Sequence, residues 1–288
     1  MVWVNAVVQG ALVGGLYALF AAGLSLVFGV MRLVNLAHGD LAILAAYLAV
    51  LLADHEGLSP WLSLLVVVPA MAAAGFVLQF AVLNFTLDSG LAPLLATFGL
   101  AVIVQNALQE GFTANVRGLN AGSIATRSIR VTNEISIGWL PLLTLVAAFV
   151  LLGGLQLGLQ HSSLGRALRA TSDDQRAAQL VGIDNRRLYG IAMAISLGTA
   201  AVAGIFLGMR TTFDPYAGPV RLIFACEAVI IGGLGSLWGT LLGGIVLGVA
   251  QGVGDQVNPG WGVLAGHLVF LAVLLVRPTG LLGKAAPA

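Results

Sequence analysis

Long apolar runs constrain this chain more than any other feature of its sequence. The first thirty residues, MVWVNAVVQGALVGGLYALFAAGLSLVFGV, contain only Asn5 and Gln9 as clearly polar side chains. Further apolar runs follow at 61–84, 93–112, 139–160, 190–209 and 263–276. A helix needs about 20 apolar residues to cross the hydrocarbon core of a bilayer. The pattern therefore predicts a protein that crosses a membrane several times.

Composition supports the same interpretation. The 288 residues are 59% hydrophobic and 9% charged, with a mean hydropathy of +0.99, whereas a soluble domain carries roughly 25% charged residues. We expect one transmembrane domain over 1–288, an all-α polytopic bundle of eight or nine helices with broken or re-entrant helices. Gly10, Gly14 and Gly15 predict a small-residue packing face on the first helix.

Several function classes are disfavoured by composition. The net charge is +1 and the arginines are spread over loops, so we expect no nucleic-acid partner. The single cysteine, Cys226, excludes an internal disulfide and a cysteine metal cluster. The sequence contains no G-x-x-x-x-G-K-[ST] motif. We therefore expect no cofactor, and any ATP-driven step would need an ATPase on another polypeptide.

Residues 161–190, HSSLGRALRATSDDQRAAQLVGIDNRRLYG, form a long polar block with helical character. Such a block must lie in water beside the bilayer, because the hydrocarbon core excludes its charges. Ser172 with Gln175 predicts a capping box, and Gly182 predicts a left-handed helix stop. Two interpretations stay open from the residues alone. The enclosed helix docks on a soluble partner, or the block is an ordinary basic loop that fixes topology.

A second polar segment, MRLVNLAHGDLAILAAY at 31–47, lies between two apolar runs. Asn35 is placed to cap a new helix, and Gly39 permits close backbone approach. Transporters place substrate groups at discontinuous helices of this kind. The alternative is an interfacial turn in which Asn35 and Asp40 only satisfy backbone donors. His38 has no second metal ligand at helical spacing, so we do not expect it to bind a metal.

Glu227 is an acidic residue inside an apolar run. Such a placement costs at least about 2.5 kcal/mol, so the side chain is usually paired or functional. It could accept a substrate ammonium group or a proton, or pair with Arg221 or a partner subunit. The glycines at 232, 233 and 235 predict an interrupted helix just after it. Whether 222–235 crosses the membrane or re-enters stays open.

Three stretches resemble one family, the LivH-type permeases of branched-chain amino acid ABC transporters. They are GRALRATSDDQRAAQLVGI, GLSLVFGVMRLVNLAHGD and GGLGSLWGTLLGG. The resemblance implies a subunit that performs no chemistry itself and that couples to separate ATPases through the loop at 161–190. The coupling residues that it implies are Gly165, Arg166, Arg169, Asp173, Ala177, Ala178, Gly182 and Ile183. The candidate substrate pathway comprises Asn35, His38, Asp40, Glu227, Gly232, Gly233 and Gly235.

The resemblance also implies partners and a location. Two ABC ATPase subunits, a second homologous permease and an extracytoplasmic substrate-binding protein are expected, in a bacterial inner membrane. The binding protein would meet the outward-facing, Gly/Asn/Ser/Thr-rich loop at 113–138, for which we expect a small hairpin. Permeases similar to these also serve urea, short amides and other amino acids. An ion-coupled secondary transporter, with Glu227 and Asp40 as coupling carboxylates, and a passive channel are further alternatives.

Overall fold

The computed structural model describes residues 2–86, 90–130 and 136–283. The long helices are α1 (Val2–Met31), α2 (His38–Glu56), α3 (Pro60–Ala81), α4 (Ala92–Phe112), α5 (Trp139–His161), α8 (Asn185–Arg210) and α10 (Leu237–Val257). Shorter ones are α6 (Ser163–Asp173), α7 (Gln175–Leu180), α9 (Gly218–Gly232) and α11 (Gly262–Val276), with single 3₁₀ turns at Leu83–Phe85 and Gly122–Ile124. Strands β1 (Ser128–Arg130) and β2 (Ser136–Gly138) pair antiparallel, which confirms a hairpin within 113–138.

The described part of the chain contains 7 helices long and apolar enough to cross a membrane. The 15-residue helices α9 and α11 bring the bundle close to the expected eight or nine. The prediction of an all-α polytopic membrane protein is confirmed.

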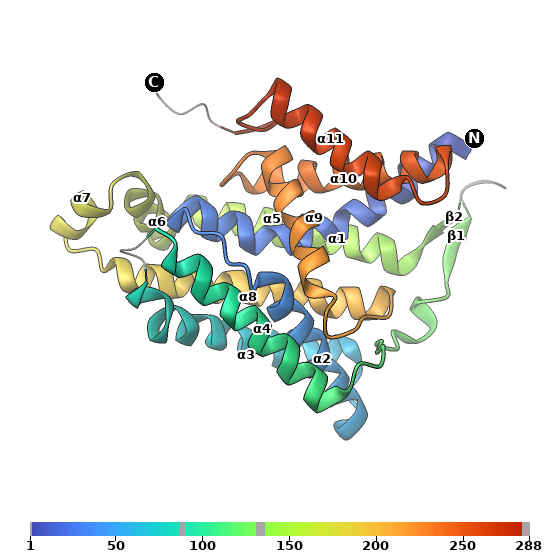
Figure 1. Cartoon of the computed structure of the whole chain (residues 1–288), viewed down its shortest axis with the longest axis horizontal. Coiled ribbons are helices and arrows are strands. Elements are labelled where there is room, and N and C mark those ends of the chain that lie inside the picture. The colour runs from blue at the N-terminus through green and yellow to red at the C-terminus, as the bar shows by residue number, and fades with distance from the viewer. Residues whose placement is uncertain (1, 87–89, 131–135, 284–288) are drawn as a thin grey trace.

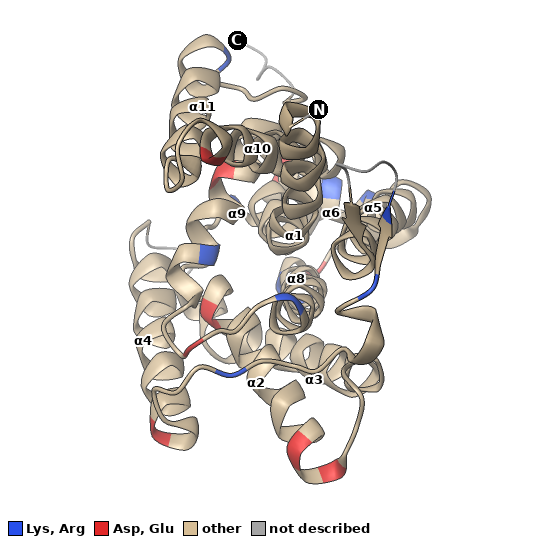
Figure 2. Ribbon diagram, turned by 90° about the vertical axis from the view of Figure 1, so that its right-hand side faces the viewer, with Lys and Arg blue, Asp and Glu red and all other residues tan. Residues whose placement is uncertain are grey.

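Helix α9 is the broken helix that the glycines predict. Its 15 residues rise about 22 Å, less than the roughly 30 Å thickness of a hydrocarbon core. Figure 1 shows α9 running across the direction of α1 and α8, and Figure 2, which views α1 and α8 nearly end-on, shows the same. The chain turns at Gly233 and Gly235, whose φ angles are +108° and +79°. Ser236 then caps α10 by accepting from the Gly239 amide.

Helix α1 lies at the centre of the bundle, and 83% of its most apolar window is buried. A Cβ added at Gly10 or Gly14 would lie 2.5 Å from the carbonyl oxygen of Gly248 or Gly244, respectively, both in α10. Absent side chains thus let the two backbones touch, which is how small residues drive helix association in lipid. The predicted packing face of α1 is confirmed.

The two ends of the bundle differ. Figure 1 places the N-terminus and the β1–β2 hairpin at one end, and α6 and α7 at the opposite end. Gln9 on α1 donates to the Ser136 carbonyl across 2.7 Å and so ties the hairpin to the first span. The last described residues lie at the α6 end, because Leu282 borders the same cavity as Gly165. The start and the described end of the chain therefore lie on opposite sides, as an odd number of crossings requires.

Candidate functional site

The polar segment between α5 and α8 forms two capped helices. The Ser162 hydroxyl accepts from the Gly165 amide (3.0 Å) at the start of α6. The Asp174 carboxylate accepts from the amides of Arg176 (2.8 Å) and Ala177 (3.0 Å) at the start of α7. The predicted box of Ser172 and Gln175 is wrong. Asp174 has extended backbone, φ −148°, and its carboxylate favours the positive end of a helix.

Ser172, which does not cap α7 as predicted, forms a hydrogen bond elsewhere. It lies inside α6 and its hydroxyl donates to the carbonyl oxygen of Gly29, near the end of α1, across 2.6 Å. Asn185, at the start of α8, accepts from Thr171 of α6 (3.2 Å) and donates to the Gln175 carbonyl of α7 (3.0 Å). These bonds join the polar helix pair to two spans, α1 and α8. The sequence patterns gave no indication of the role of Asn185.

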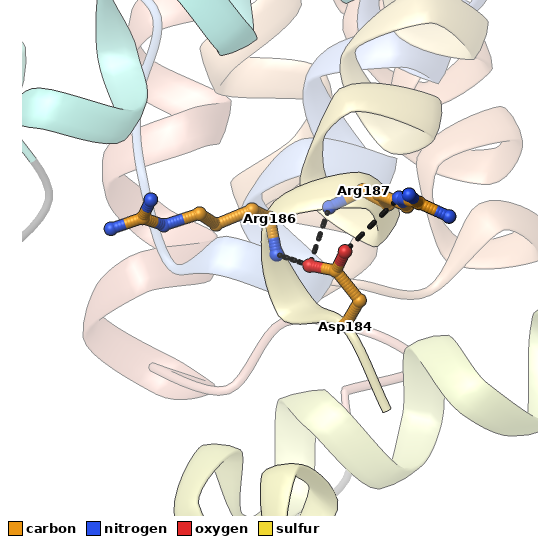
Figure 3. Close-up of polar contacts among 3 residues, drawn as sticks. All are labelled: Asp184, Arg186 and Arg187. Atoms are coloured by element: carbon orange, nitrogen blue, oxygen red, sulfur yellow. Dashed lines mark hydrogen bonds and ion pairs between the residues drawn. The ribbon is translucent and has the colours of Figure 1, made fainter. Parts of the chain in front are cut away.

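The end of the polar segment is fixed at Gly182 and Asp184. Gly182 has φ +88°, as predicted for a left-handed stop. Figure 3 shows the Asp184 carboxylate accepting from the amides of Arg186 (3.1 Å) and Arg187 (3.3 Å), and pairing with the Arg187 guanidinium at 3.1 Å. Both charged side chains are exposed, so we assign Asp184 the role of an N-cap of α8 and give the ion pair little weight.

The predicted coupling residues divide by exposure. Gly165 and Ala178 are buried and Ile183 is half-buried, so they support the segment from inside. The exposed members are Arg166, Arg169, Asp173, Ala177 and Gly182.

The most exposed apolar side chains of the segment are Leu180 and Val181, at 89% and 77%. They lie next to each other at the C-terminal end of α7. Sequence reasoning did not single out Leu180, because helical periodicity does not show which face of so short a helix is left free.

A cavity of about 650 Å³ lies where the polar segment meets the spans. Its lining includes Gly29 of α1, Arg169 and Asp173 of α6, Gly235 of the turn between α9 and α10, and Trp238 of α10. Gly235 also lies against Gly29. The structure therefore brings three of the predicted coupling residues, Gly165, Arg169 and Asp173, and one predicted pathway glycine to the same cavity.

The turn after α9 is covered by the end of the chain. The amides of Leu281 and Leu282 donate to the carbonyls of Ile231 (2.8 Å) and Gly232 (2.9 Å). Gly232 itself packs against Gly239 of α10 without space for a side chain. This turn is therefore tightly packed.

The polar residues at the start of α2 are buried, each with a partner. Asn35 accepts from the Ala37 amide (3.0 Å), which makes a turn before the helix, whereas the N-cap position belongs to Ala37. The His38 ring bonds to the Phe20 carbonyl through Nε2 (2.9 Å). Asp40 accepts from Gln105 of α4 across 2.9 Å. The expected helix cap by Asn35 is thus replaced by a local turn.

Helix α9 passes close to this group. A Cβ at Gly39 would overlap the Gly218 carbonyl, and one at Gly218 would overlap the Asp40 carboxylate. The predicted close approach at Gly39 is confirmed, and Asp40 lies beside the first residue of the broken helix.

Glu227 of α9 has its partner on α11. Its Oε1 is hydrogen-bonded to the Nδ1 of His267, and its Oε2 is buried without a protein partner. The sequence suggested that Glu227 pairs with Arg221 or with a partner subunit, and the pair with Arg221 is not found. His267 lies forty positions away and on a different helix, so no local pattern could reveal it.

The candidate pathway residues thus form three separate groups. Asn35, His38 and Asp40 lie at the start of α2, Glu227 lies in the middle of α9, and the three glycines lie at the turn beyond it. Helix α9 connects all three. Among the residues that the structure describes, no group of three His, Cys, Asp or Glu side chains is placed to hold a metal ion.

The apolar spans, the broken helix and the capped polar helix pair at one end of the bundle together define a multi-pass α-helical membrane protein. Residues 6–276 match the family described as branched-chain amino acid transport system / permease component. The chain belongs to this family.

Curated relatives agree with this assignment. The chain is 32% identical to the high-affinity branched-chain amino acid transport system permease protein BraD of Pseudomonas aeruginosa, over 98% of this chain and 96% of that protein. It is 27% identical to LivH of Escherichia coli K12, over 96% of this chain and 94% of LivH. It is also 29% identical to LivM of the same organism, over 94% of this chain and 69% of LivM. Both of these are named permease proteins of the high-affinity branched-chain amino acid transport system.

Proposed function

We propose that this chain is the membrane-spanning permease subunit of a bacterial inner-membrane ABC importer for branched-chain or closely related amino acids. The observation that carries the proposal is the apolar tip of Leu180 and Val181, on a helix pair bonded to both α1 and α8. A secondary carrier or a channel that acts alone has no need of such a tip. Family membership supplies the substrate class.

The partners are inferred from the same features. Two ATPase subunits would bind the α7 tips of two permeases and carry out ATP hydrolysis, so that this chain performs no chemistry. Escherichia coli holds two different relatives, LivH and LivM, which supports a second, homologous permease as the other half of the pathway. An extracytoplasmic binding protein would approach the opposite end, where the hairpin lies.

Coupling follows from the bonds of the polar segment. Movement of an ATPase would displace α6 and α7 together, because Asn185 bonds to both. The Ser172 hydroxyl would transmit that displacement to Gly29 at the end of α1. Gly29 touches Gly235 in the turn after α9. Helix α9 carries Glu227, so movement at the ATPase would shift the broken helix between its outward-facing and inward-facing positions.

The proposal is tested by purifying the tagged chain from its native membrane in mild detergent and identifying the co-purifying chains by intact mass. We expect ATPase subunits, and we expect their loss when Leu180 and Val181 are both changed to Asp. The matched control is Val116→Asp, an exposed valine in the loop at the other end of the bundle. A chain that never purifies with an ATPase, under any nucleotide condition, would refute the proposal.

A further inference from the structure

Two arginines in the bundle lack an acidic partner. Arg210 ends α8 and Arg221 lies in the first turns of α9; both are half-buried. Arg210 donates to the Leu12 carbonyl (3.1 Å), and the Nε of Arg221 is buried without a partner. In the described part of the chain, the ion pairs found are Arg187–Asp184 and His267–Glu227, neither of which involves these arginines.

Both arginines lie close to the central helix α1. Arg210 bonds to its Leu12 carbonyl, and Arg221 lies three residues before Phe224, whose ring packs on Tyr17, a residue with an exposure of only 7%. The Tyr17 hydroxyl donates to Gln251 Oε1, and the Nε2 of Gln251 is buried without a partner. The Tyr17 ring packs on Phe224 of α9 with centroids 5.0 Å apart. Unused hydrogen-bond donors of Arg221 and Gln251 therefore lie around one buried tyrosine.

Such an arrangement is unfavourable unless an anion is present. Two like charges repel more strongly where the dielectric constant is low, and a buried charge without a counter-charge destabilises a fold. The first turns of the 15-residue helix α9 add the positive end of a helix dipole at the same place. Guanidinium groups bind carboxylates through paired hydrogen bonds.

Helix α9 also carries a negatively charged residue, Glu227. Glu227 lies six residues beyond Arg221, a rise of about 9 Å. One of its carboxylate oxygens is unpartnered. Phe224 lies between the two charges in sequence and belongs to an apolar cluster with Ile231 and Leu247. Positive charge, apolar surface and negative charge thus occur together, as a zwitterion with an apolar side chain requires.

We propose that Arg210 and Arg221 bind the α-carboxylate of the transported amino acid inside the bundle, with Glu227 accepting its ammonium group. This inference rests on the proposed function and narrows it, because an uncharged substrate such as urea has no group for the two arginines.

The test uses the complex that purifies with the tagged chain, reconstituted in liposomes, with ATP inside and with its binding protein outside. Initial uptake of labelled leucine is compared for wild type, Arg221→Gln and Arg221→Lys. We expect the Gln variant to lose tenfold or more in uptake rate, and the Lys variant to keep an intermediate rate. The control is Arg32→Gln, an exposed arginine at the opposite end of the bundle, which should match wild type.

Three outcomes have separate meanings. If Arg221→Gln takes up leucine at the wild-type rate, the carboxylate site is refuted while the proposed function stands. If the wild-type complex takes up urea and not leucine, the proposed function itself fails. If the loss in Arg221→Gln occurs only in liposomes with anionic lipid, the arginines hold a lipid headgroup and the inference is overturned. Retention of the ATPase chains shows that each variant is assembled, and Arg210→Gln provides a second test should Arg221→Gln fail to assemble.

Discussion

The contact between α1 and α10 predicts a measurable effect of a single methyl group. A Cβ at Gly14 would lie 2.5 Å from the carbonyl oxygen of Gly244 and 2.6 Å from the Cα of Ile245. Carbon atoms in ordinary contact are about 3.5–4.0 Å apart, so Gly14→Ala must separate the two helices by about 1 Å. Overpacking of this kind destabilises a fold by about 1–3 kcal/mol. An alanine also raises helix propensity by up to about 1 kcal/mol, which offsets part of that loss.

A matched variant isolates the packing contribution. Gly154 lies in α5 with nothing within 4 Å of its would-be Cβ, so Gly154→Ala gains propensity without a clash. We expect Gly14→Ala to unfold at a lower temperature than Gly154→Ala in the same detergent, with a difference in free energy of about 1–3 kcal/mol. Thermal unfolding followed by size-exclusion chromatography measures this directly. Equal melting temperatures would show that α1 and α10 are not in backbone contact.

Three further predictions concern the polar segment and Glu227. Asp174→Ala should remove the α7 cap, a loss of about 1 kcal/mol, seen as faster amide hydrogen exchange in α7 alone. Val181→Ser should weaken ATPase binding by roughly 10- to 150-fold, because full burial of a valine contributes about 1.5–3 kcal/mol, while Val116→Ser leaves the affinity measured by titration unchanged. His267→Ala should destabilise the fold by about 1–3 kcal/mol, since it leaves the buried Glu227 carboxylate without its hydrogen-bond partner in the protein; normal thermal stability would show that water or lipid already solvates this carboxylate.

Features that depend on neighbours in sequence could be predicted. The apolar runs gave the spans, Gly14 marked the packing face of α1, and Gly182 marked the end of α7. The hairpin followed from the alternating polar and branched residues before Trp139. In each case the determining physics, hydropathy or backbone conformation, acts within a few residues of the signal.

Features that depend on contacts between helices could not be predicted from the sequence. The capping box at Ser172 was a valid local pattern, but the serine hydroxyl is used by Gly29 of another helix, and Asp174 supplies a stronger cap. Ala178 is in the segment that the sequence identified and yet is buried. The Glu227–His267 pair depends on how α9 and α11 cross. No local pattern fixes such crossings.

The arginines of the proposed carboxylate site also could not be identified from local sequence patterns. In the sequence, Arg210 and Arg221 flank a short polar stretch and look like ordinary loop charges at the end of a span. Their importance comes from the central helix α1, about two hundred positions away, and from the lack of an ion pair for either arginine among the described residues. Only the three-dimensional arrangement of α1, α8 and α9 reveals two half-buried arginines without an ion-pair partner.

A measurement of ATP-dependent uptake is the most direct test of the proposed importer function. The complex purified through this chain is reconstituted in liposomes with its binding protein, and entry of labelled leucine is followed with ATP, without ATP, and with a proton or sodium gradient in its place. If the chain belongs to an ABC importer, we expect uptake that requires ATP hydrolysis and the binding protein. Uptake that follows the ion gradient in the absence of ATP would contradict it and would identify a secondary carrier.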